Sequence, residues 1–192
     1  LPRLNLRLGV EVNADAPDSE ELRVFGMRDR VVADLLYRYS KRDYAMLHTA
    51  WGRYHLQSDG FLGSGQELSW ELGHLLRTQN PDLKLRLTGV HARFDTDVNA
   101  AIALPQDVNI FGLCLGSGDL PRPVYARAWR PAADVCATHN GTGGAGYSMA
   151  FGLAGSVFGR DQLSLSAEQG SGGSNLSNAL TREFTLNYRY FY

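Results

Sequence analysis

The C-terminal segment Ala179–Tyr192 alternates strictly between apolar and polar positions. One face carries Phe184, Leu186, Tyr188, Tyr190 and Tyr192, and the other carries Thr181, Glu183, Thr185, Asn187, Arg189 and Phe191. A period of two residues predicts a β-strand with one apolar and one polar side. A soluble β-sandwich would give the same alternation, but tyrosines at the end of an apolar face are typical of the aromatic girdle of an outer-membrane barrel. We therefore expect the apolar side of this strand to contact membrane lipid.

The same alternation recurs along the chain and predicts ten strands, which indicates an all-β, antiparallel transmembrane β-barrel. The predicted strands are Arg3–Asn13, a second that ends at Ser40 and begins between Leu22 and Arg30, Tyr44–Leu56, a fourth that follows the glycine-rich loop Gln57–Gly65, Leu83–Phe94, Asp107–Gly116, Val124–Thr138, Gly144–Phe158, Gln162–Gly170 and Ala179–Tyr192. In the seventh strand Pro131 removes a backbone donor, so a β-bulge is expected there.

The third strand is the one whose two faces are hardest to assign. We prefer the arrangement in which its even-numbered residues face outward, because this places an aromatic ring near each end of the outward face and Arg53 inside the barrel. The outward set is then Tyr44, Met46, His48, Ala50, Gly52, Tyr54 and Leu56.

The predicted connections alternate between two kinds. Those after the odd-numbered strands are longer, more acidic or richer in glycine, and those after the even-numbered strands are mostly tighter. Outer-membrane barrels have short periplasmic turns and long external loops, so both chain ends are expected on the periplasmic side. The acidic residues of the expected outer loops are Asp15, Asp18, Glu20, Glu21, Asp59, Asp95 and Asp97. They serve either for solvation or as an electrostatic path for cations.

Composition narrows the class of protein without changing this picture. The 192 residues carry a formal net charge of −1, and no basic stripe suggests a nucleic-acid partner. The mean hydropathy of −0.25 is compatible with a barrel, whose polar inner residues offset the outer ones. No apolar run of about 18 residues predicts a transmembrane helix. No signal peptide is visible at Leu1, so we expect a mature chain or a fragment of one.

The polar faces of the predicted strands carry charges of both signs, and these are the candidate site residues. They form either a ladder of cross-strand ion pairs or the polar wall of a channel for a hydrated solute, and the two interpretations are compatible. The candidates along the solute path are Arg7, Glu11, Asp34, Arg38, Glu67, Glu71, Arg86, Glu168, Glu183 and Arg189.

The two cysteines, Cys114 and Cys136, are expected to be free. A hairpin that turned near Leu120 would place Cys114 opposite Ala126, so that Cys136 would lie roughly 30 Å farther along its strand. That separation exceeds the reach of a disulfide, which is about 7 Å between Cα atoms. No Cys/His spacing supports a metal site, and no cofactor is expected.

Catalysis has one candidate constellation, His91 with Asp95 and Asp97. Barrel enzymes such as omptin-like proteases and lipid hydrolases need a histidine with carboxylates, or a serine with a histidine, at one rim. Because Asp95 and Asp97 lie in or near a predicted loop, we do not expect an enzyme. A barrel hydrolase and a structural barrel anchor remain as the alternatives.

Several segments resemble the C-terminal outer-membrane β-barrel of PelB, the export porin for the Pel exopolysaccharide. They are Asn109–Leu113, Arg130–Asp134, Thr138–Asn140, Gly144–Tyr147, Phe151–Gly159, Thr181–Phe184 with Tyr192, Arg28–Arg30 and Leu36–Tyr39. These are barrel-strand motifs rather than catalytic ones, and they cover most of the chain.

The resemblance implies a non-enzymatic channel of the Gram-negative outer membrane for a cationic, hexosamine-rich exopolysaccharide of the biofilm matrix. Its implied partners are outer-membrane lipid, a periplasmic helical-repeat region of the same protein, and a ring of PelC-type lipoproteins at the periplasmic mouth. The family's barrel is expected to have sixteen strands, whereas ten are readable here. We therefore interpret residues 1–192 as one barrel domain, with N-terminal strands absent or some loops left out.

Overall fold

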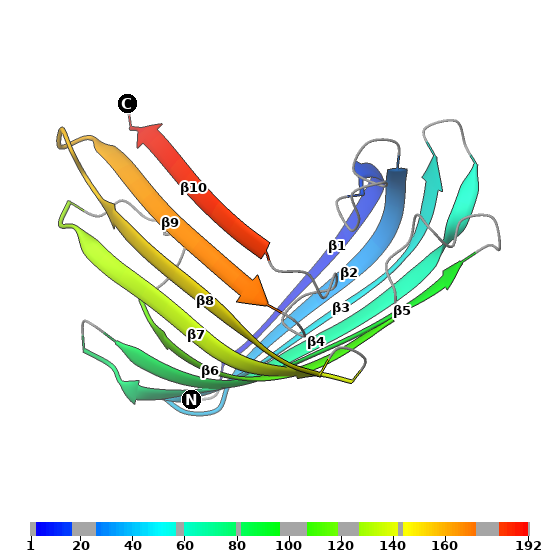
Figure 1. The fold of residues 1–192 in the computed structure, drawn as a ribbon, viewed down its shortest axis with the longest axis horizontal. Coiled ribbons are helices and arrows are strands. Elements are labelled where there is room, and N and C mark those ends of the chain that lie inside the picture. Colours follow the sequence, from blue (N-terminus) through cyan, green and yellow to red (C-terminus); the bar gives the residue numbers. More distant parts are fainter. Residues whose placement is uncertain are drawn as a thin grey trace. The chain divides into compact units, whose positions relative to one another are not determined.

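The computed structural model describes residues 3–16, 26–56, 60–79, 82–96, 107–118, 127–141, 144–171 and 181–191. Ten strands lie in these ranges (Figure 1), which confirms the predicted number. They are β1 Arg3–Asp15, β2 Gly26–Arg38, β3 Asp43–Leu56, β4 Phe61–Arg77, β5 Leu83–Thr96, β6 Val108–Ser117, β7 Arg130–Asn140, β8 Gly144–Gly155, β9 Asp161–Ser171 and β10 Thr181–Tyr190. Among the described residues, no helix is long and apolar enough to cross a membrane.

The strands form one ten-stranded sheet in which hydrogen-bonded neighbours follow the order of the chain. The pairs β1–β2, β2–β3, β7–β8, β8–β9 and β9–β10 are antiparallel. The contacts divide the chain into two compact units. The first unit contains Leu1–Leu72 and Thr88–Ile110, and the second contains Gly73–Leu87 and Phe111–Tyr192. This meander agrees with the predicted antiparallel all-β class.

The register of the first unit separates an apolar face from a polar face. On the apolar face Leu6 lies opposite Leu35, which in turn lies opposite Leu47. On the polar face Arg7 lies opposite Asp34. Large side chains on the apolar face are left exposed, and Leu8 and Trp51 expose 70% and 69% of their surface. Such exposure on regular strands means that this face requires a covering medium other than the chain's own residues.

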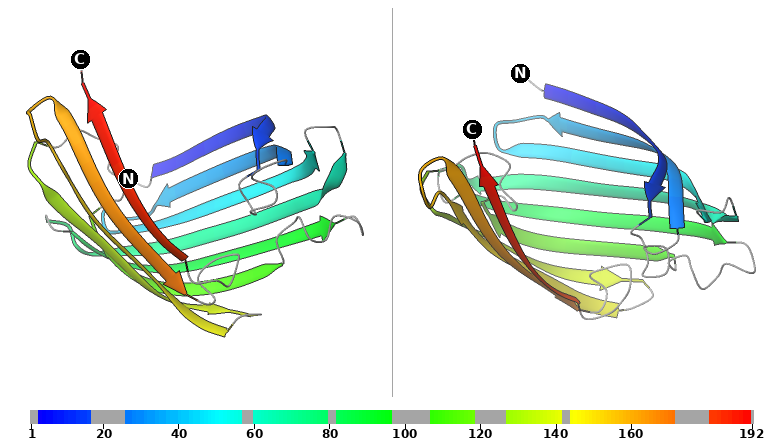
Figure 2. Two further views of the ribbon diagram at one scale, coloured as in Figure 1. Left: turned by 45° about the horizontal axis from the view of Figure 1, so that its top comes forward. Right: turned by 90° about the horizontal axis from the view of Figure 1, so that it is seen from above.

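The second unit has the same two faces, and Figure 2 shows its strands β7 to β10 side by side. Phe151 lies opposite Ala167, which lies opposite Phe184 on the apolar face. Ser166 lies opposite Thr185 on the polar face. The alternation predicted for the C-terminal segment is therefore confirmed, with β10 ending at Tyr190.

The predicted faces of the third strand are wrong. In the structure Ala50 pairs with Val32 and His48 pairs with Asp34, so the even-numbered residues of β3 lie on the polar face. Tyr54 is buried there and packs against Phe94, with ring centroids 6.1 Å apart. Tyr54 forms a small core with Ala16 and Leu62, and Leu56 and Phe94 pack against it. Arg53 lies on the opposite, apolar face, across from Asp29.

The predicted alternation between longer and tighter connections is found only in part. The glycine-rich segment after β3 is short, because Phe61–Gly65 already belongs to β4. The connection between β6 and β7 is longer than predicted, since β7 begins at Arg130 rather than Val124. No bulge occurs at Pro131 in the β7–β8 pair, whose register runs without a shift. The register shift that is seen lies in β1, between Glu11 and Ala14.

The prediction of free cysteines is wrong, because Cys114 and Cys136 form a disulfide with Cα atoms 4.0 Å apart. The predicted turn near Leu120 put Cys114 opposite Ala126, and this register differs from the one in the structure. Gly118 lies against Ala132, where a Cβ at position 118 would come within 2.9 Å of the Ala132 Cβ. Cys114 lies four residues before Gly118 and Cys136 four residues after Ala132, so the two cysteines face each other across β6 and β7.

Candidate functional site

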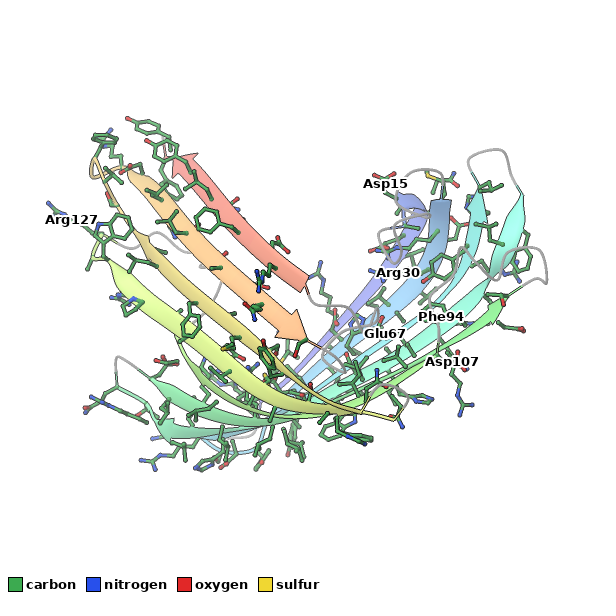
Figure 3. All side chains as sticks on the ribbon, in the orientation of Figure 1. Asp15, Arg30, Glu67, Phe94, Asp107 and Arg127 are labelled. Atoms are coloured by element: carbon green, nitrogen blue, oxygen red, sulfur yellow. A yellow bond between two sulfur atoms is a disulfide. The ribbon has the colours of Figure 1, made fainter. Side chains whose placement is uncertain are left out.

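The polar face of the first unit holds a fixed cluster of charges at one end of β1 and β2. Glu11 Oε2 accepts hydrogen bonds from Arg28 Nε at 3.2 Å and from Arg30 Nε at 2.7 Å, and its Oε1 accepts one from Arg30 Nη2 at 3.2 Å. Arg30 can lie there because residue 52 is glycine, since a Cβ would come within 2.6 Å of the Arg30 Cβ. Figure 3 shows Arg30 and Glu67 pointing to the same side of the sheet. Glu11 is thus held by two guanidinium groups.

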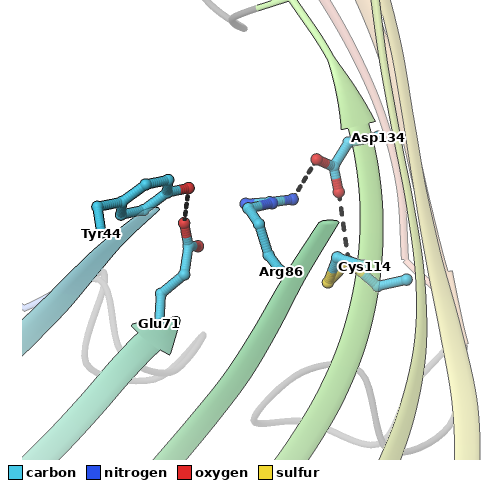
Figure 4. The surroundings of a disulfide bond; sticks show 6 residues. Tyr44, Glu71, Arg86, Cys114 and Asp134 are labelled. Atoms are coloured by element: carbon cyan, nitrogen blue, oxygen red, sulfur yellow. Dashed lines mark hydrogen bonds and ion pairs between the residues drawn. A yellow bond between two sulfur atoms is a disulfide. The ribbon is translucent and has the colours of Figure 1, made fainter. Parts of the chain in front are cut away.

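A groove of about 460 Å³ lies elsewhere in the first unit, and none of the three residues of this cluster lines it. Its polar lining residues are Asn5, Arg7, Asp34, His48, Ser69, Glu71 and Thr88. His48 Nδ1 lies 2.6 Å from Asp34 Oδ1. Tyr44 donates a hydrogen bond of 2.5 Å to Glu71 Oε1 (Figure 4). The groove therefore offers carboxylates, hydroxyl groups, an amide and a guanidinium group, which can donate and accept hydrogen bonds.

The polar face of the second unit is cross-linked near the disulfide. Arg86 on β5 reaches Asp134 on β7 and forms an ion pair with it (Figure 4). The Asp134 carboxylate lies over Gly116, where a Cβ would come within 2.6 Å of Oδ2. The Cys136 Sγ atom lies 3.3 Å from Asp134 Oδ1, a contact without a hydrogen because the sulfur is oxidised. The disulfide thus joins the neighbouring strands β6 and β7, and the ion pair joins β5 to β7 across β6.

Beyond this cross-link, β9 and β10 carry a column of small polar side chains. Ser164 lies opposite Asn187, and Ser166 lies opposite Thr185. At the end of the column Glu168 lies directly opposite Glu183, and both side chains are exposed. Like charges that face each other across two strands repel. The Glu168 side chain makes no hydrogen bond or ion pair with another described residue, so this part of the wall carries uncompensated negative charge.

The structure places all ten predicted site residues on the polar face of the sheet. Those that are held by other side chains are Glu11, Asp34, Glu71, Arg86 and Glu183. Those whose side chains make no hydrogen bond or ion pair within the described part of the chain are Arg7, Arg38, Glu67, Glu168 and Arg189. Arg38 lies opposite Arg3, and Arg189 lies opposite Gln162. The predicted ion-pair ladder is therefore only partial within the described residues.

Sequence reasoning missed several partners of these residues. Tyr44 and His48 were assigned to the wrong face, although their polar atoms bind Glu71 and Asp34. Asp134 was not singled out as a site residue, because the register between β6 and β7 was misplaced. The signal for Asp134 was its position two residues before Cys136, on the face that carries the cysteine.

The catalytic alternative gains no support from the geometry of its residues. His91 and Asp95 both lie in β5 and have no hydrogen bond to each other, while Asp97 lies outside the described residues. Asp18, Glu20, Glu21 and Asp59 of the predicted outer loops also lie outside them. The one group of potential metal ligands within the described ranges is Cys114, Asp134 and Cys136. Its two sulfurs are joined in the disulfide, so they are not thiolate ligands.

The chain matches the family described as PelB, C-terminal beta barrel domain, over residues 1–191. The chain belongs to this family. The family match confirms the resemblance drawn from strand motifs, and it identifies a barrel family rather than an enzyme family.

A solved structure described as a bacterial polysaccharide outer membrane secretin has the same fold. Its TM-score is 0.65 at 9% sequence identity, and the match covers 97% of this chain and 63% of that chain. The chain thus spans less than two thirds of the length of that protein. The comparison with curated proteins found no match. For this member of the PelB barrel family, the polar face is the surface on which a transport function has to be sought.

Proposed function

We propose that this chain is part of an outer-membrane channel that exports a cationic exopolysaccharide of the Pel type into the biofilm matrix of a Gram-negative bacterium. Membership of the PelB C-terminal barrel family is the observation that carries the proposal. The likeness to a polysaccharide outer membrane secretin supports the fold on which it depends. In this arrangement the apolar face meets lipid, and the polar face lines the path of the sugar chain.

The charge on the polar face supports a cationic solute. Glu168 and Glu183 lie side by side in the second unit. In the first unit, Asp34 and Glu71 line the groove beside His48 and Tyr44. Protonated amino groups of a partly deacetylated hexosamine polymer would be attracted to such carboxylates. Serine, threonine and asparagine side chains would exchange weak hydrogen bonds with the sugar hydroxyls, so that the polymer can move on.

The partners in this proposal follow from the family. They are the exopolysaccharide, outer-membrane lipid, a periplasmic helical-repeat region of the same protein, and a ring of PelC-type lipoproteins at the periplasmic mouth. Residues 1–192 contribute one barrel domain to this assembly. The C-terminal end of β10 and the tight β8–β9 turn would lie on the periplasmic side, where outer-membrane barrels have short turns.

The test is conductance of the full-length protein in planar bilayers. We expect an open channel whose current is blocked from one side by glucosamine oligosaccharides that carry free amino groups. Acetylated oligosaccharides of the same length are the matched ligand control and should block weakly. Replacing Glu168 and Glu183 by Gln should weaken the block, while Leu165→Val, on the apolar face of the same strand pair, should leave it unchanged. A protein without conductance, or one blocked only by anionic oligosaccharides, would contradict the proposal.

A further inference from the structure

The tight connection between β8 and β9 presents large apolar side chains on a rigid backbone. Phe158 exposes 81% of its surface and Val157 exposes 48%. Both residues lie in a turn that is organised around Asp161, a residue with no exposed surface. Asp161 Oδ1 accepts hydrogen bonds from the backbone N–H groups of Val157, Phe158 and Gly159 at 3.1, 2.7 and 3.1 Å. The apolar side chains are therefore held outward by a fixed scaffold.

The turn is also tied to the last strand. The backbone N–H of Phe191 donates to the carbonyl of Arg160 at 2.8 Å. Asp161 lies opposite Tyr190 in the β9–β10 register, and Figure 1 shows the end of β10 beside the β8–β9 turn. Tyr188 and Tyr190 belong to the apolar face and are about half exposed. The turn that carries Phe158 thus lies beside the end of β10 that carries Tyr188 and Tyr190.

The turn that carries Phe158 also carries a basic residue, Arg160. The Arg160 side chain is exposed and forms no hydrogen bond or ion pair with the described part of the chain. The β2–β3 turn of the first unit has the same composition, with stacked Tyr37 and Tyr39 followed by Lys41 and Arg42. Aromatic rings next to basic residues are the usual anchors at the boundary between lipid hydrocarbon and headgroups.

We infer that the β8–β9 turn binds phospholipid at the membrane surface, with the Phe158 ring among the upper acyl chains and the Arg160 guanidinium on a headgroup phosphate. This inference rests on the membrane location contained in the proposed function. A soluble protein partner is the alternative occupant of the same surface. Lipid is favoured because the turn adjoins the end of β10 that carries the exposed rings of Tyr188 and Tyr190, and because a phosphate complements the unpaired cation.

The experiment places the photoreactive residue p-benzoylphenylalanine at position 158 of the full-length protein, in vesicles of phosphatidylethanolamine and phosphatidylglycerol. Position 186, on the apolar face, and position 166, on the polar face, serve as matched sites. Mass spectrometry after illumination should find phospholipid adducts at positions 158 and 186 and none at position 166. Phosphatidylglycerol should be over-represented among the adducts at position 158, and Arg160→Gln should remove this excess.

The other outcomes show whether the lipid-binding turn alone is wrong or whether the proposed membrane location is wrong as well. Lipid adducts at position 186 without any at position 158 would overturn the lipid-binding turn and leave the barrel in the membrane. In native outer membranes, adducts at position 158 to protein alone would replace lipid by a protein partner. An unchanged lipid ratio in Arg160→Gln would remove the headgroup contact. Absence of lipid adducts at position 186 would overturn the membrane location and the lipid-binding turn together.

Discussion

Asp134 lies over the backbone of β6 at Gly116, so close that a Cβ at position 116 would come within 2.6 Å of the carboxylate. The glycine leaves the space through which Arg86 on β5 reaches Asp134 on β7. A charged pair thus spans a strand to which neither of its members belongs. The stability of this part of the sheet depends on a residue that contributes no side chain.

Replacing Gly116 by Val should break this arrangement. The new side chain would displace the Asp134 carboxylate and separate it from Arg86. Overpacking of this kind costs about 1–3 kcal/mol of folding free energy. Urea unfolding from lipid vesicles, followed by tryptophan fluorescence, measures the change. Gly9→Ala is the matched control, because the nearest atom to a Cβ there, the Val32 Cβ, is 4.0 Å away. Equal stabilities of the two variants would contradict the role assigned to Gly116.

The disulfide should be present in the mature protein and should stabilise it. Cys114 and Cys136 are 22 residues apart in the chain, and closing a loop of that size stabilises a fold by about 3 kcal/mol in the chain-entropy model. The double variant Cys114→Ser, Cys136→Ser should therefore unfold at lower urea concentration than the wild type. The wild type treated with a reductant should approach the variant. Alkylation of both cysteines in the unreduced, unfolded protein would show that the bond does not form.

The sequence pattern predicts some strands of this fold correctly and others not. The period of two in Arg3–Asn13 and in Ala179–Tyr192 was sufficient to place β1 and β10 and their faces. It failed for β3, because Tyr44 and Tyr54 count as apolar in a pattern although the Tyr44 hydroxyl binds a carboxylate. It also failed for the start of β7, where Val124–Ala128 alternates as a strand would. Register depends on the length of connections, which alternation does not determine.

The candidate site was predictable as a set of residues but not as an arrangement. The alternation alone placed Glu11, Asp34 and Glu71 on the polar face. It could not tell that Glu11 binds two arginines whereas Glu168 faces another carboxylate, because these pairs depend on which residues of neighbouring strands lie opposite each other. A shift of two residues in one strand would keep every face and change every partner.

A charge on the apolar face should be far more damaging than the same charge on the polar face. Leu186 and Thr185 are neighbours in β10 that lie on opposite faces of the sheet. Leu186→Arg should lose about 2–4 kcal/mol of folding free energy, the cost of arginine near the middle of a bilayer. Thr185→Arg should lose much less, because its side chain would remain in water. Urea titrations in vesicles compare the two variants, and similar losses would indicate that lipid does not cover the apolar face.

Neutralising one member of the facing carboxylates should stabilise the β9–β10 pair. Glu168→Gln removes the repulsion with Glu183, and cross-strand charge effects of this kind amount to roughly 0.2–1 kcal/mol. The gain should shrink at high salt, because ions screen the repulsion. Unfolding in low-salt and high-salt buffer measures both effects. Glu67→Gln, which removes one carboxylate from the polar face of the first unit, is the comparison variant. A gain in stability as large as that of Glu168→Gln would assign the effect to the change in net charge instead.

The covalent bond between β6 and β7 also links the biogenesis of this protein to the redox state of the compartment in which it matures. The two thiols have to be oxidised and paired with each other before or while the strands take their final register. A cell that lacks thiol oxidation outside its cytoplasm would therefore make a sheet without this cross-link, even with an intact set of export genes. Under the export function proposed above, secretion would then fail because the channel does not assemble, even though the polymer is synthesised.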